Sequence, residues 1–482
     1  MKKARQHIFL VLAILVILFP VTAGGAERQS STPNTSDKID PLKEMRLTIG
    51  RSILPEGGDP QVLHGILKRG QMVIFDETPE EIPLFISSAI LINTPPEPIW
   101  SVVSDFEKFP DWVPSCHSID TVKRGDNIYD ITYSLGFKFI FLPLYVKYTI
   151  RRYDRPPLRL DYIGLGGTIE KTYGWNQNIP VDDGNTMFFY TTWALPGSGL
   201  LKHLYRKYPF LDVGISVSAG IVYSKKVKER AEILKGEEKV ELMDITQVSP
   251  EISKDEELKI MELLSSRGPV QIFKEPEEGK PSLVSTWVTF AAPPEQVWAD
   301  LVDYENYYYF MPMMNGIKVL ERDKEKARVE YKYDINIVFF SSKIKYQLEH
   351  RYHEPGRITW TNIKGNRYVQ SGSWELYPLN DGKKTLALYQ IHYDTSKLGF
   401  LPKLILKVIP EGKLAVNSYL SSIDVRELRD WIEAPAELRS ELKELKERER
   451  NLRWQEWKRK RKEQILGQCD GTTSPLINKG GK

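Results

Sequence analysis

The sequence has few of the residues and motifs that mark common enzyme and metal-binding classes. Its 482 residues include only two cysteines, Cys116 and Cys469, which is too few for a metal framework and allows at most one disulfide. It contains no His-Glu-x-x-His, Gly-x-Ser-x-Gly, phosphate-binding loop or dinucleotide-binding glycine pattern. A formal net charge of +3 is too small to indicate nucleic-acid binding. We therefore predict a protein that is not an enzyme and binds no metal or cofactor.

The start of the chain has the pattern of a secretory signal peptide at residues 1–26. Three basic residues precede an apolar run at 8–19, and small residues at 22–26 offer a cleavage site. The run is shorter than the about 20 residues that favour a membrane-spanning helix, although an uncleaved anchor is an alternative. Residues 27–40 are rich in Ser, Thr, Asn and Asp, which is typical of a flexible tether. We expect an exported protein, either periplasmic or secreted.

One segment of the sequence occurs twice. Residues 95–106 read Pro-Pro-Glu-Pro-Ile-Trp-Ser-Val-Val-Ser-Asp-Phe, and residues 293–304 read Pro-Pro-Glu-Gln-Val-Trp-Ala-Asp-Leu-Val-Asp-Tyr, 198 residues further on. The same spacing aligns Arg69-Gly70 with Arg267-Gly268, and it holds without a gap from about 69 to about 174. The chain is therefore a tandem duplication, and we expect the two copies to do variants of one task.

Each copy begins with a short preamble and then a strand and a helix. In the first copy the pattern predicts a helix ending near Lys68, strands at 72–75 and 85–92, and a helix after the double proline. The helix after the double proline ends at Asp105, and its counterpart ends at Asp303. We interpret both carboxylates as caps of a second short helix. Trp100 and Trp298 are interpreted as core residues that fix the first of these helices to the sheet.

The remainder of each copy alternates apolar and polar residues with a period of two, which predicts an antiparallel sheet with one buried face. Gly164-Leu165-Gly166-Gly167 is interpreted as a turn between strands. The second copy closes with a helix from about Leu414 to Glu433. The later strands are predicted at 158–163, 168–176, 186–194, 356–361, 366–376 and 385–393.

This order of elements resembles the START-like, helix-grip fold. The opening motif, Pro-Pro-Glu-x-hydrophobic-Trp followed by Asp-aromatic-Glu, resembles the polyketide cyclase and coenzyme-Q-binding group of that superfamily, and Trp112-Val113-Pro114 fits its usual Trp-x-Pro segment. The second copy departs there, with Phe310-Met311-Pro312. The resemblance implies an α+β fold in which a curved antiparallel sheet wraps around a long C-terminal helix. It also implies an apolar tunnel between them for a lipid, sterol, quinone or polyketide.

The predicted boundaries follow from the duplication. They are a signal peptide (1–26), a tether (27–40), a first START-like domain with its preamble (41–235), a linker (236–255), a second such domain (256–434) and a charged helical or disordered tail (435–482). We expect the two domains to be separable folding units, because the segment between them is polar.

The alternating strands place one set of side chains toward the expected tunnel. Arg152 and His350 continue the buried face of their strands and are candidate polar handles for the head of an apolar ligand, unless the strand has simply reached the rim there. His350 and His353 point to opposite faces, so they do not form a metal pair. The predicted lining residues are Tyr133, Phe137, Tyr148, Arg152 and Tyr162 in the first copy, and Tyr331, Ile335, Tyr346, His350 and Trp360 in the second.

The tail has an acidic half followed by a basic half. Its simplest interpretation is a solvated helix or a disordered segment. The alternative is a peripheral membrane anchor, with two Trp at headgroup depth and a basic face toward anionic lipid. The residues concerned are Trp454, Trp457, Lys458, Arg459, Lys460, Arg461 and Lys462.

Three functions fit these observations. We expect an exported protein that sequesters or transfers a lipid-like ligand. The first alternative is a cyclase or aromatase-type enzyme acting in the same tunnel, and an export signal argues against it because intracellular substrates would be on the other side of the membrane. The second alternative is a structural or partner-binding module whose cavities are filled by the abundant inward Tyr and Phe side chains.

Overall fold

The computed structural model of the chain describes twelve stretches. They are residues 53–54, 56–76, 85–113, 116–139, 142–181, 184–196, 211–235, 253–274, 282–337, 340–365, 369–394 and 412–448. The predicted signal peptide and tether, all but the last three residues of the predicted linker, and residues 449–482 of the tail lie outside them. In the part of the chain described, no helix combines the length and apolarity needed to cross a bilayer.

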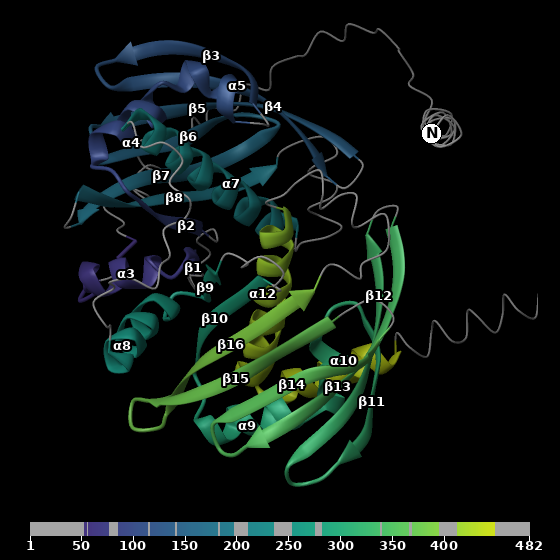
Figure 1. Cartoon of the computed structure of the whole chain (residues 1–482). Coiled ribbons are helices and arrows are strands. Elements are labelled where there is room, and N and C mark those ends of the chain that lie inside the picture. The colour runs from purple at the N-terminus through teal and green to yellow at the C-terminus, as the bar shows by residue number, and fades with distance from the viewer. Residues whose placement is uncertain are drawn as a thin grey trace, which may run out of the picture. The chain divides into compact units, whose positions relative to one another are not determined.

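The first copy has the predicted order of elements (Figure 1). It consists of α3 (Pro60–Leu67), β1 (Gln71–Asp76), β2 (Phe85–Ile92), α4 (Pro96–Ser104), η1 (Phe106–Lys108), α5 (Phe109–Trp112), β3 (Cys116–Gly125), β4 (Ile128–Phe139), β5 (Leu142–Arg155), β6 (Arg159–Gly167), β7 (Ile169–Val181), β8 (Asn185–Pro196) and the closing helix α7 (Leu211–Leu234). Pro95 and Pro96 end the strand and begin α4, because proline lacks the ladder donor but fits a helix's first turn.

The second copy repeats this order. It consists of α8 (Lys254–Ser265), β9 (Val270–Lys274), β10 (Ser282–Phe290), α9 (Pro294–Val302), η3 (Tyr304–Asn306), α10 (Tyr307–Phe310), β11 (Met314–Arg322), β12 (Lys326–Ile337), β13 (Phe340–His353), β14 (Arg357–Gly365), β15 (Val369–Leu379), β16 (Lys384–Asp394) and the closing helix α12 (Gly412–Glu433). The fold class is therefore α+β, with two tandem helix-grip domains, as predicted.

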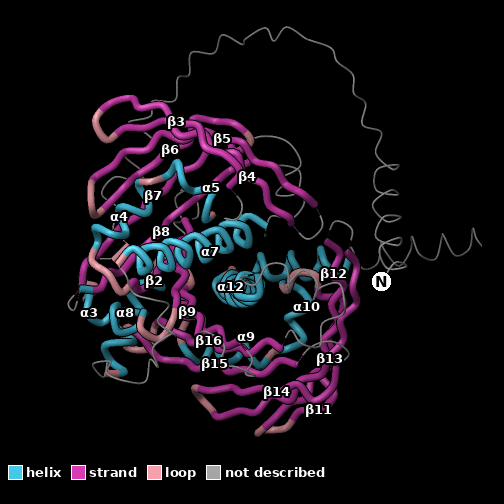
Figure 2. Tube along the Cα trace, turned by 45° about the horizontal axis from the view of Figure 1, so that its top comes forward, coloured by secondary structure: helices cyan, strands magenta, loops and turns pink. Residues whose placement is uncertain are grey.

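The strands of both copies form one antiparallel sheet. Its order is β11-β12-β13-β14-β15-β16-β10-β9-β1-β2-β8-β7-β6-β5-β4-β3, so the two preamble strands β1 and β9 pair at its centre. Each half of the sheet curves around its own closing helix, and the two helices contact each other (Figure 2). The alternating residues therefore face a helix, which is what the two-residue period predicts.

The two preambles share one hydrophobic core. It is built by Leu63 and Ile66 of α3, Ile74 of β1, and Ile260 and Leu264 of α8, all buried. Two ion pairs cross between the preambles, Arg69 to Glu257 (2.9 Å) and Arg267 to Asp76. Residues 44–482 accordingly form one compact unit. The sequence pattern does not predict this contact between the preambles, because it assigns each preamble to its own copy alone.

A buried polar cluster fixes the closing helix α12 to its sheet. Gln271 of β9 donates from Nε2 to the Ser418 carbonyl oxygen (2.9 Å), and Thr286 of β10 and Ser421 share a hydrogen bond between their hydroxyls (2.6 Å). In the first copy Gln71 bonds the Ser88 hydroxyl (2.8 Å) and reaches the Ile221 carbonyl of α7. These satisfied polar groups set the position of each helix along the sheet.

Two local predictions are wrong. The stretch Gly164-Leu165-Gly166-Gly167 is the end of strand β6 and not a turn, because glycines at positive φ (117° and 122° at 166 and 167) allow an irregular strand to continue beside β5. Asp105 and Asp303 make no side-chain cap. Asp105 accepts from Lys108 Nζ (2.6 Å) and Asp303 from Asn306 Nδ2 (2.6 Å), so both carboxylates bind a side chain three residues on.

The described start of the tail is helical and contacts the second copy. Residues 436–448 form a helix. Arg439 pairs with Asp300 (3.1 Å), and Lys443 lies 5.5 Å from the ring centroids of both Tyr309 and Trp431. These contacts place the basic side chains of this helix against the second copy, while most of its residues are exposed, as in the solvated helix of the sequence interpretation. The residues of the predicted membrane anchor, from 454 on, are outside the described part.

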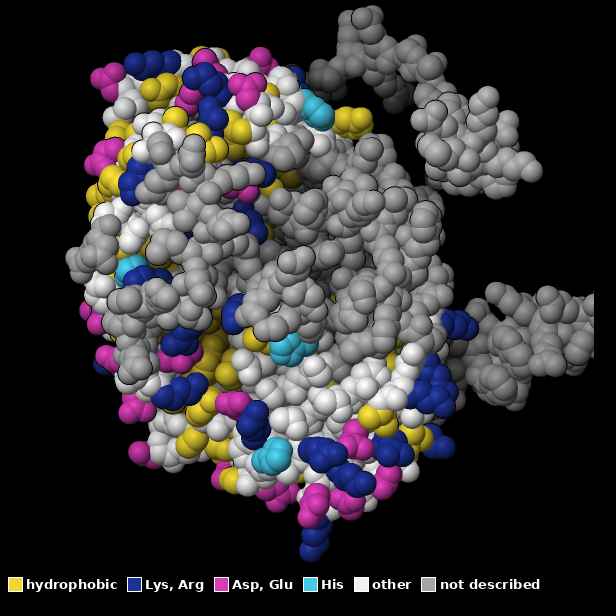
Figure 3. Space-filling model, viewed as in Figure 1, with side chains coloured by type: hydrophobic (Ala, Val, Ile, Leu, Met, Phe, Trp, Pro, Cys, Tyr) yellow, Lys and Arg dark blue, Asp and Glu magenta, His cyan; other side chains and the backbone are white. Residues whose placement is uncertain are grey.

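Charged residues of both signs are interspersed on the described surface of the face shown in Figure 3. Cys116 is buried, whereas Cys469 lies outside the described residues. Trp100 and Trp298 pack against the two cores as half-buried residues, so they fix α4 and α9 from the edge of the core and not from its centre.

Candidate functional site: the interior between sheet and closing helix

The number of residues that separates equivalent positions of the two copies is larger in the closing helices than in the strands. Glu232 of α7 accepts from the Asn93 backbone N–H (3.2 Å), and Glu433 of α12 accepts from the Ala291 N–H (2.7 Å). Asn93 and Ala291 are 198 residues apart, but the two glutamates are 201 apart. Tyr223 of α7 therefore occupies the position of Asp424 in α12.

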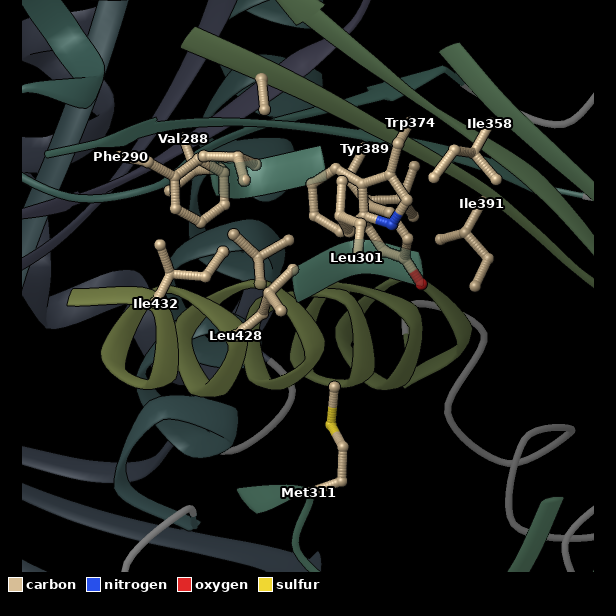
Figure 4. Packing of buried hydrophobic residues seen from close by; sticks show 14 of the residues in the cluster. Val288, Phe290, Leu301, Met311, Ile358, Trp374, Tyr389, Ile391, Leu428 and Ile432 are labelled. Atoms are coloured by element: carbon tan, nitrogen blue, oxygen red, sulfur yellow. The ribbon is translucent and has the colours of Figure 1, made fainter. Parts of the chain in front are cut away.

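The second copy brings most of its predicted lining residues together. Tyr331 on β12, Tyr346 on β13 and Trp360 on β14 belong to or pack against the same core. His350 on β13 contacts the rings of Tyr331 and Trp360. Tyr331 and Tyr346 are stacked, with ring centroids 5.3 Å apart, and His350 lies 6.1 Å from Trp360. The side chain of Ile335 lies outside the described residues. Leu428 and Ile432 of α12 point toward this sheet face (Figure 4).

His350 is a buried neutral histidine. Its Nε2 shares a hydrogen bond with the Tyr331 hydroxyl (3.0 Å), and its ring lies 4.5 Å from that of Tyr304. Burial lowers the pKa of His350 to about 3, from its ordinary value of 6.5. His353 is exposed on the other face, as the strand period predicts. His350 is therefore an uncharged hydrogen-bonding group at neutral pH.

Asp424 is the functional candidate that the sequence analysis missed. It lies on α12, and its Oδ2 accepts a hydrogen bond from the Tyr389 hydroxyl of β16 (2.9 Å). Burial raises the pKa of the Asp424 carboxyl to about 7, and the neighbouring Glu427 adds to the rise. The charge of Asp424 helps to raise the pKa of the hydroxyls of Tyr307, Tyr331 and Tyr333, so several tyrosines lie around the carboxyl. The sequence carries a signal for this position, because Asp424 lies one helical turn from both Leu420 and Leu428, which pack on the core.

Trp360 has an unsatisfied polar atom in the same interior. Its side chain is 5% exposed, and its Nε1 donor has no hydrogen-bond partner among the described residues. The ring stacks on Tyr389, with centroids 5.6 Å apart. Gly372 on β15 leaves room for it, because an added Cβ there would overlap the Trp360 ring and the Gln390 carbonyl oxygen. A buried donor without a partner is unusual and suits a bound polar group.

In the first copy Arg152 is fully paired inside the protein. It is 2% exposed, its guanidinium binds the Asp154 carboxylate (2.5 Å), and Nη1 donates to the Val103 carbonyl oxygen (2.6 Å). Its charged end lies 5.1 Å from the Phe106 ring and 5.8 Å from that of Trp100. Arg152 therefore ties α4 to β5, and these contacts leave little of it to orient a ligand.

The other lining residues of the first copy form a tyrosine cluster. Tyr133 and Tyr148 are stacked at 5.6 Å, and Tyr190 lies 4.7 Å from Tyr223. Tyr162 is buried and donates to the Thr192 hydroxyl (2.9 Å). The hydroxyl of Tyr223 accepts from Asn176 Nδ2 (3.3 Å). Burial raises the pKa of Tyr223 above its ordinary value of 10. The side chain of Phe137 lies outside the described residues.

The arrangement permits binding and, in the second copy, proton exchange. Tyr333, Tyr346 and Asp424 are half-buried, although their side chains lie on the inner face between the sheet and α12. No group of His, Cys, Asp and Glu side chains able to hold a metal occurs in the described ranges. The interior therefore combines aromatic walls with one carboxyl that titrates near neutral pH.

Two segments of the chain match one family model, described as polyketide cyclase / dehydrase and lipid transport. The matches cover residues 92–171 in the first copy and residues 290–416 in the second. No curated protein sequence matches the chain.

Several solved structures are similar to the chain. The di-domain ARO/CYC BexL from the BE-7585A biosynthetic pathway is 14% identical over 73% of this chain and 99% of its own, with a TM-score of 0.27. The STAR-related lipid transfer protein from Xanthomonas axonopodis is 15% identical over 33% of this chain and 94% of its own, with a TM-score of 0.24. The human StarD13 lipid transfer and protein localization domain is 16% identical over 34% and 85%, with a TM-score of 0.27.

The family match falls separately on each copy, and each copy has a sheet that curves around its closing helix. The chain therefore carries two tandem START-like, helix-grip domains, and the polyketide cyclase / dehydrase and lipid transport model matches a segment of each.

Proposed function

We propose that the chain is an exported protein that binds or transfers a lipid-like molecule, held between the sheet and the closing helix. The observation that carries this proposal is the interior of the second copy, where aromatic walls surround the single carboxyl of Asp424. Ligand pockets are mostly apolar with a few polar groups that fix orientation, and this interior has that composition. The match to this family model supports a fold that binds hydrophobic ligands.

The binding energy would come from apolar contact. Removing apolar surface from water contributes about 25 cal/mol per Å², so a single long acyl chain suffices for useful affinity. Asp424, Tyr389 and the free donor of Trp360 would orient the polar end of the ligand. This arrangement replaces the sequence-based choice of Arg152 as a handle, because Arg152 is already paired with Asp154.

The test is recovery of a ligand from the purified full-length chain. We expect native mass spectrometry to show an adduct and organic extraction to release a lipid-like molecule. Tyr333→Trp adds volume on the inner face of β12, and we expect it to lower occupancy while the fold is retained. Lys332→Trp, on the exposed face of the same strand, is the matched control. Failure to recover any adduct, together with no binding of added amphiphiles, would reject the proposal.

A cyclase or aromatase-type enzyme is the second candidate, and Asp424 is the observation that favours it. A carboxyl with a pKa of about 7 can both give and take a proton near neutral pH. Incubation with a poly-β-keto thioester analogue distinguishes the two candidates. A cyclised product that Asp424→Asn abolishes would support the enzyme, whereas recovery of the unchanged analogue from a stable complex would support the carrier.

Export and membrane contact are separate parts of the proposal. The apolar segment at 8–19 supports export, and cell fractionation with detection of a C-terminal tag tests it. The basic end of the tail, with Trp454 and Trp457, would contact anionic lipid. Deleting 450–482 should then weaken sedimentation with phosphatidylglycerol vesicles. Equal sedimentation of both forms would reject the membrane contact alone.

A further inference from the structure

Asp424, a half-buried carboxylate on the inner face, differs from the fully enclosed acids because it has no basic partner among the described residues. The deeply buried acids each contact an arginine or lysine: Asp76 with Arg267, Asp130 with Arg124 and Arg151, Asp154 with Arg152, Asp161 with Arg155 and Arg159, Glu257 with Arg69, and Glu330 with Lys345. In the described ranges the groups that interact with Asp424 are neutral tyrosine hydroxyls, Tyr389 among them by a hydrogen bond, and the like charge of Glu427. A buried charge normally has an opposite charge beside it.

The side chains around Asp424 are those that attract an organic cation. Tyr389, its hydrogen-bond partner, lies 5.6 Å from the ring of Trp360 and 4.5 Å from the ring of Trp374. The rings of Tyr331, Tyr333 and Tyr346 form a second stacked group. The charge of Asp424 contributes to the raised pKa of the first two hydroxyls. Aromatic rings attract an ammonium group most strongly where it is desolvated. His350, the nearby base, is neutral and does not compensate the carboxylate.

We propose that the second copy selects amphiphiles whose head is an organic cation, either an alkylammonium or a quaternary ammonium group, which pairs with Asp424 among the aromatic rings. The inference rests on the proposed function, since it names the class of ligand for the same interior. The apolar tail of the ligand would lie along the remaining inner face, and a ligand oxygen would satisfy the Trp360 donor. The missing basic partner of Asp424 would thus be supplied by the ligand.

The first copy lacks this preference. Tyr223 occupies the position of Asp424, and its hydroxyl is bonded to Asn176. The charge of Arg152, paired with Asp154, acts on the hydroxyls of Tyr133 and Tyr223. A cation inside the tyrosine cluster of the first copy would therefore meet the Tyr223 hydroxyl where the second copy offers the Asp424 carboxylate. Any selectivity for cations resides in the second copy.

The experiment compares three dodecyl amphiphiles of different head charge, each below its aggregation concentration. The probes are dodecyltrimethylammonium, a neutral dodecyl glycol ether and dodecanoate, added to the full-length chain and followed by calorimetry at about pH 8. We expect the cationic probe to bind about tenfold more tightly than the neutral one, a difference of about 1.4 kcal/mol. Asp424→Asn should remove this preference, so that the variant binds the cationic and neutral probes with equal affinity. Asp430→Asn, an exposed acid on the same helix, is the control.

The pH dependence of cation affinity gives a second test. Cation affinity should rise as the pH increases through about 7, because ionised Asp424 is the binding form. The groups that face it are Tyr389 of β16, Tyr331 and Tyr333 of β12, Tyr307 of α10 and Glu427 of α12. Burial also raises the pKa of Glu427, so Glu427→Gln checks that the transition belongs to Asp424.

The outcomes separate the two proposals. If no probe binds, the proposed function fails. If all three probes bind equally and Asp424→Asn changes nothing, the ligand-binding function stands and the cation preference is overturned. A preference for the cation that survives Asp424→Asn also overturns the inference, because another group would then carry it.

Discussion

The two copies place different polar centres on the same strands. Where the first copy has Arg152 and Asp154, the second has His350 and Tyr352, each pair 198 residues apart. The first pair is a buried ion pair tied to the Val103 carbonyl. The second pair consists of His350, a neutral histidine that is hydrogen-bonded to Tyr331, and Tyr352, a half-buried tyrosine. On the closing helix, Tyr223 in the first copy corresponds to Asp424 in the second.

The difference shows how a duplicated scaffold diverges. The strands, the double proline and the inward aromatics are retained, because they build the sheet and its core. The first copy uses its charges within the protein, where a paired arginine and aspartate connect α4 to β5. The second copy leaves a carboxyl without a basic partner in the described residues, and such a group is available to a ligand. We infer that the copies differ more in what they bind than in how they fold.

Separating the copies should have the largest effect. The sequence predicts that 41–235 and 256–434 fold independently, and this remains a prediction. The shared core of α3, β1, α8 and β9 now suggests that either half alone exposes apolar surface and the edge of β1 or β9. We expect each half to have a lower thermal midpoint and to self-associate, and coexpression to restore a soluble pair. Two monomeric halves with unchanged midpoints would show instead that the preambles are dispensable for stability.

Arg152→Ala tests the ion pair of the first copy. It leaves Asp154 buried without its cation, so we expect a loss of about 3–5 kcal/mol in the free energy of unfolding. His350→Ala in the second copy should cost less, about 1–3 kcal/mol, because it leaves only a neutral hydroxyl without its partner. The exposed Arg351→Ala is the control and should change stability by at most about 0.5 kcal/mol. Chemical denaturation measures all three, and equal losses at 152 and 350 would contradict the comparison.

Gly372→Ala tests a feature that the copies share. An added Cβ would overlap the Gln390 carbonyl oxygen and the Trp360 ring, and at Gly174 it would overlap the Thr191 carbonyl oxygen and Tyr162. We expect a loss of about 1–3 kcal/mol in either copy, since neither backbone oxygen can move freely. At Gly316 the nearest atom to an added Cβ is Lys332 Cδ at 3.7 Å, so Gly316→Ala should be nearly neutral. A large loss in one copy only would show that the inner walls differ as well.

Local periodicity predicted the strands, the helices after the double prolines and the inward face that carries Tyr331 and Trp360. Local periodicity did not predict contacts between residues that are far apart in the sequence. The pairing of Arg152 with Asp154, two residues on, was visible as a same-face pair, but its contact with Val103 needs the folded position of α4. The correspondence of Asp424 with Tyr223 does not follow from the 198-residue spacing of the strands, because the closing helices are shifted by three residues relative to them. No local sequence pattern predicts the contact between the two preambles.

The smallest expected effect concerns the pH dependence of stability. Asp424 has its pKa raised from 3.8 to about 7, so the folded state holds a proton that the unfolded state has lost, and stability falls as the pH rises from about 4 to about 7. His350 has its pKa lowered from 6.5 to about 3, so the unfolded state takes up a proton first, and stability rises with pH over about 3 to 6.5. In the wild type these two effects oppose each other.

Replacing either side chain should therefore reveal the pH dependence of stability that the other side chain causes. Asp424→Asn leaves the histidine effect, and we expect its thermal midpoint to rise more steeply between about pH 4 and pH 6.5 than that of the wild type. His350→Gln leaves the aspartate effect, so its midpoint should fall over the same range. A change of about 1 kcal/mol shifts the midpoint of a domain of this size by about 2–4 °C, which calorimetry resolves. Tyr223→Phe in the first copy is the control, because burial raises the pKa of Tyr223 further from this range. Identical pH profiles for the two second-copy variants would show that neither group titrates as the interior of that copy requires.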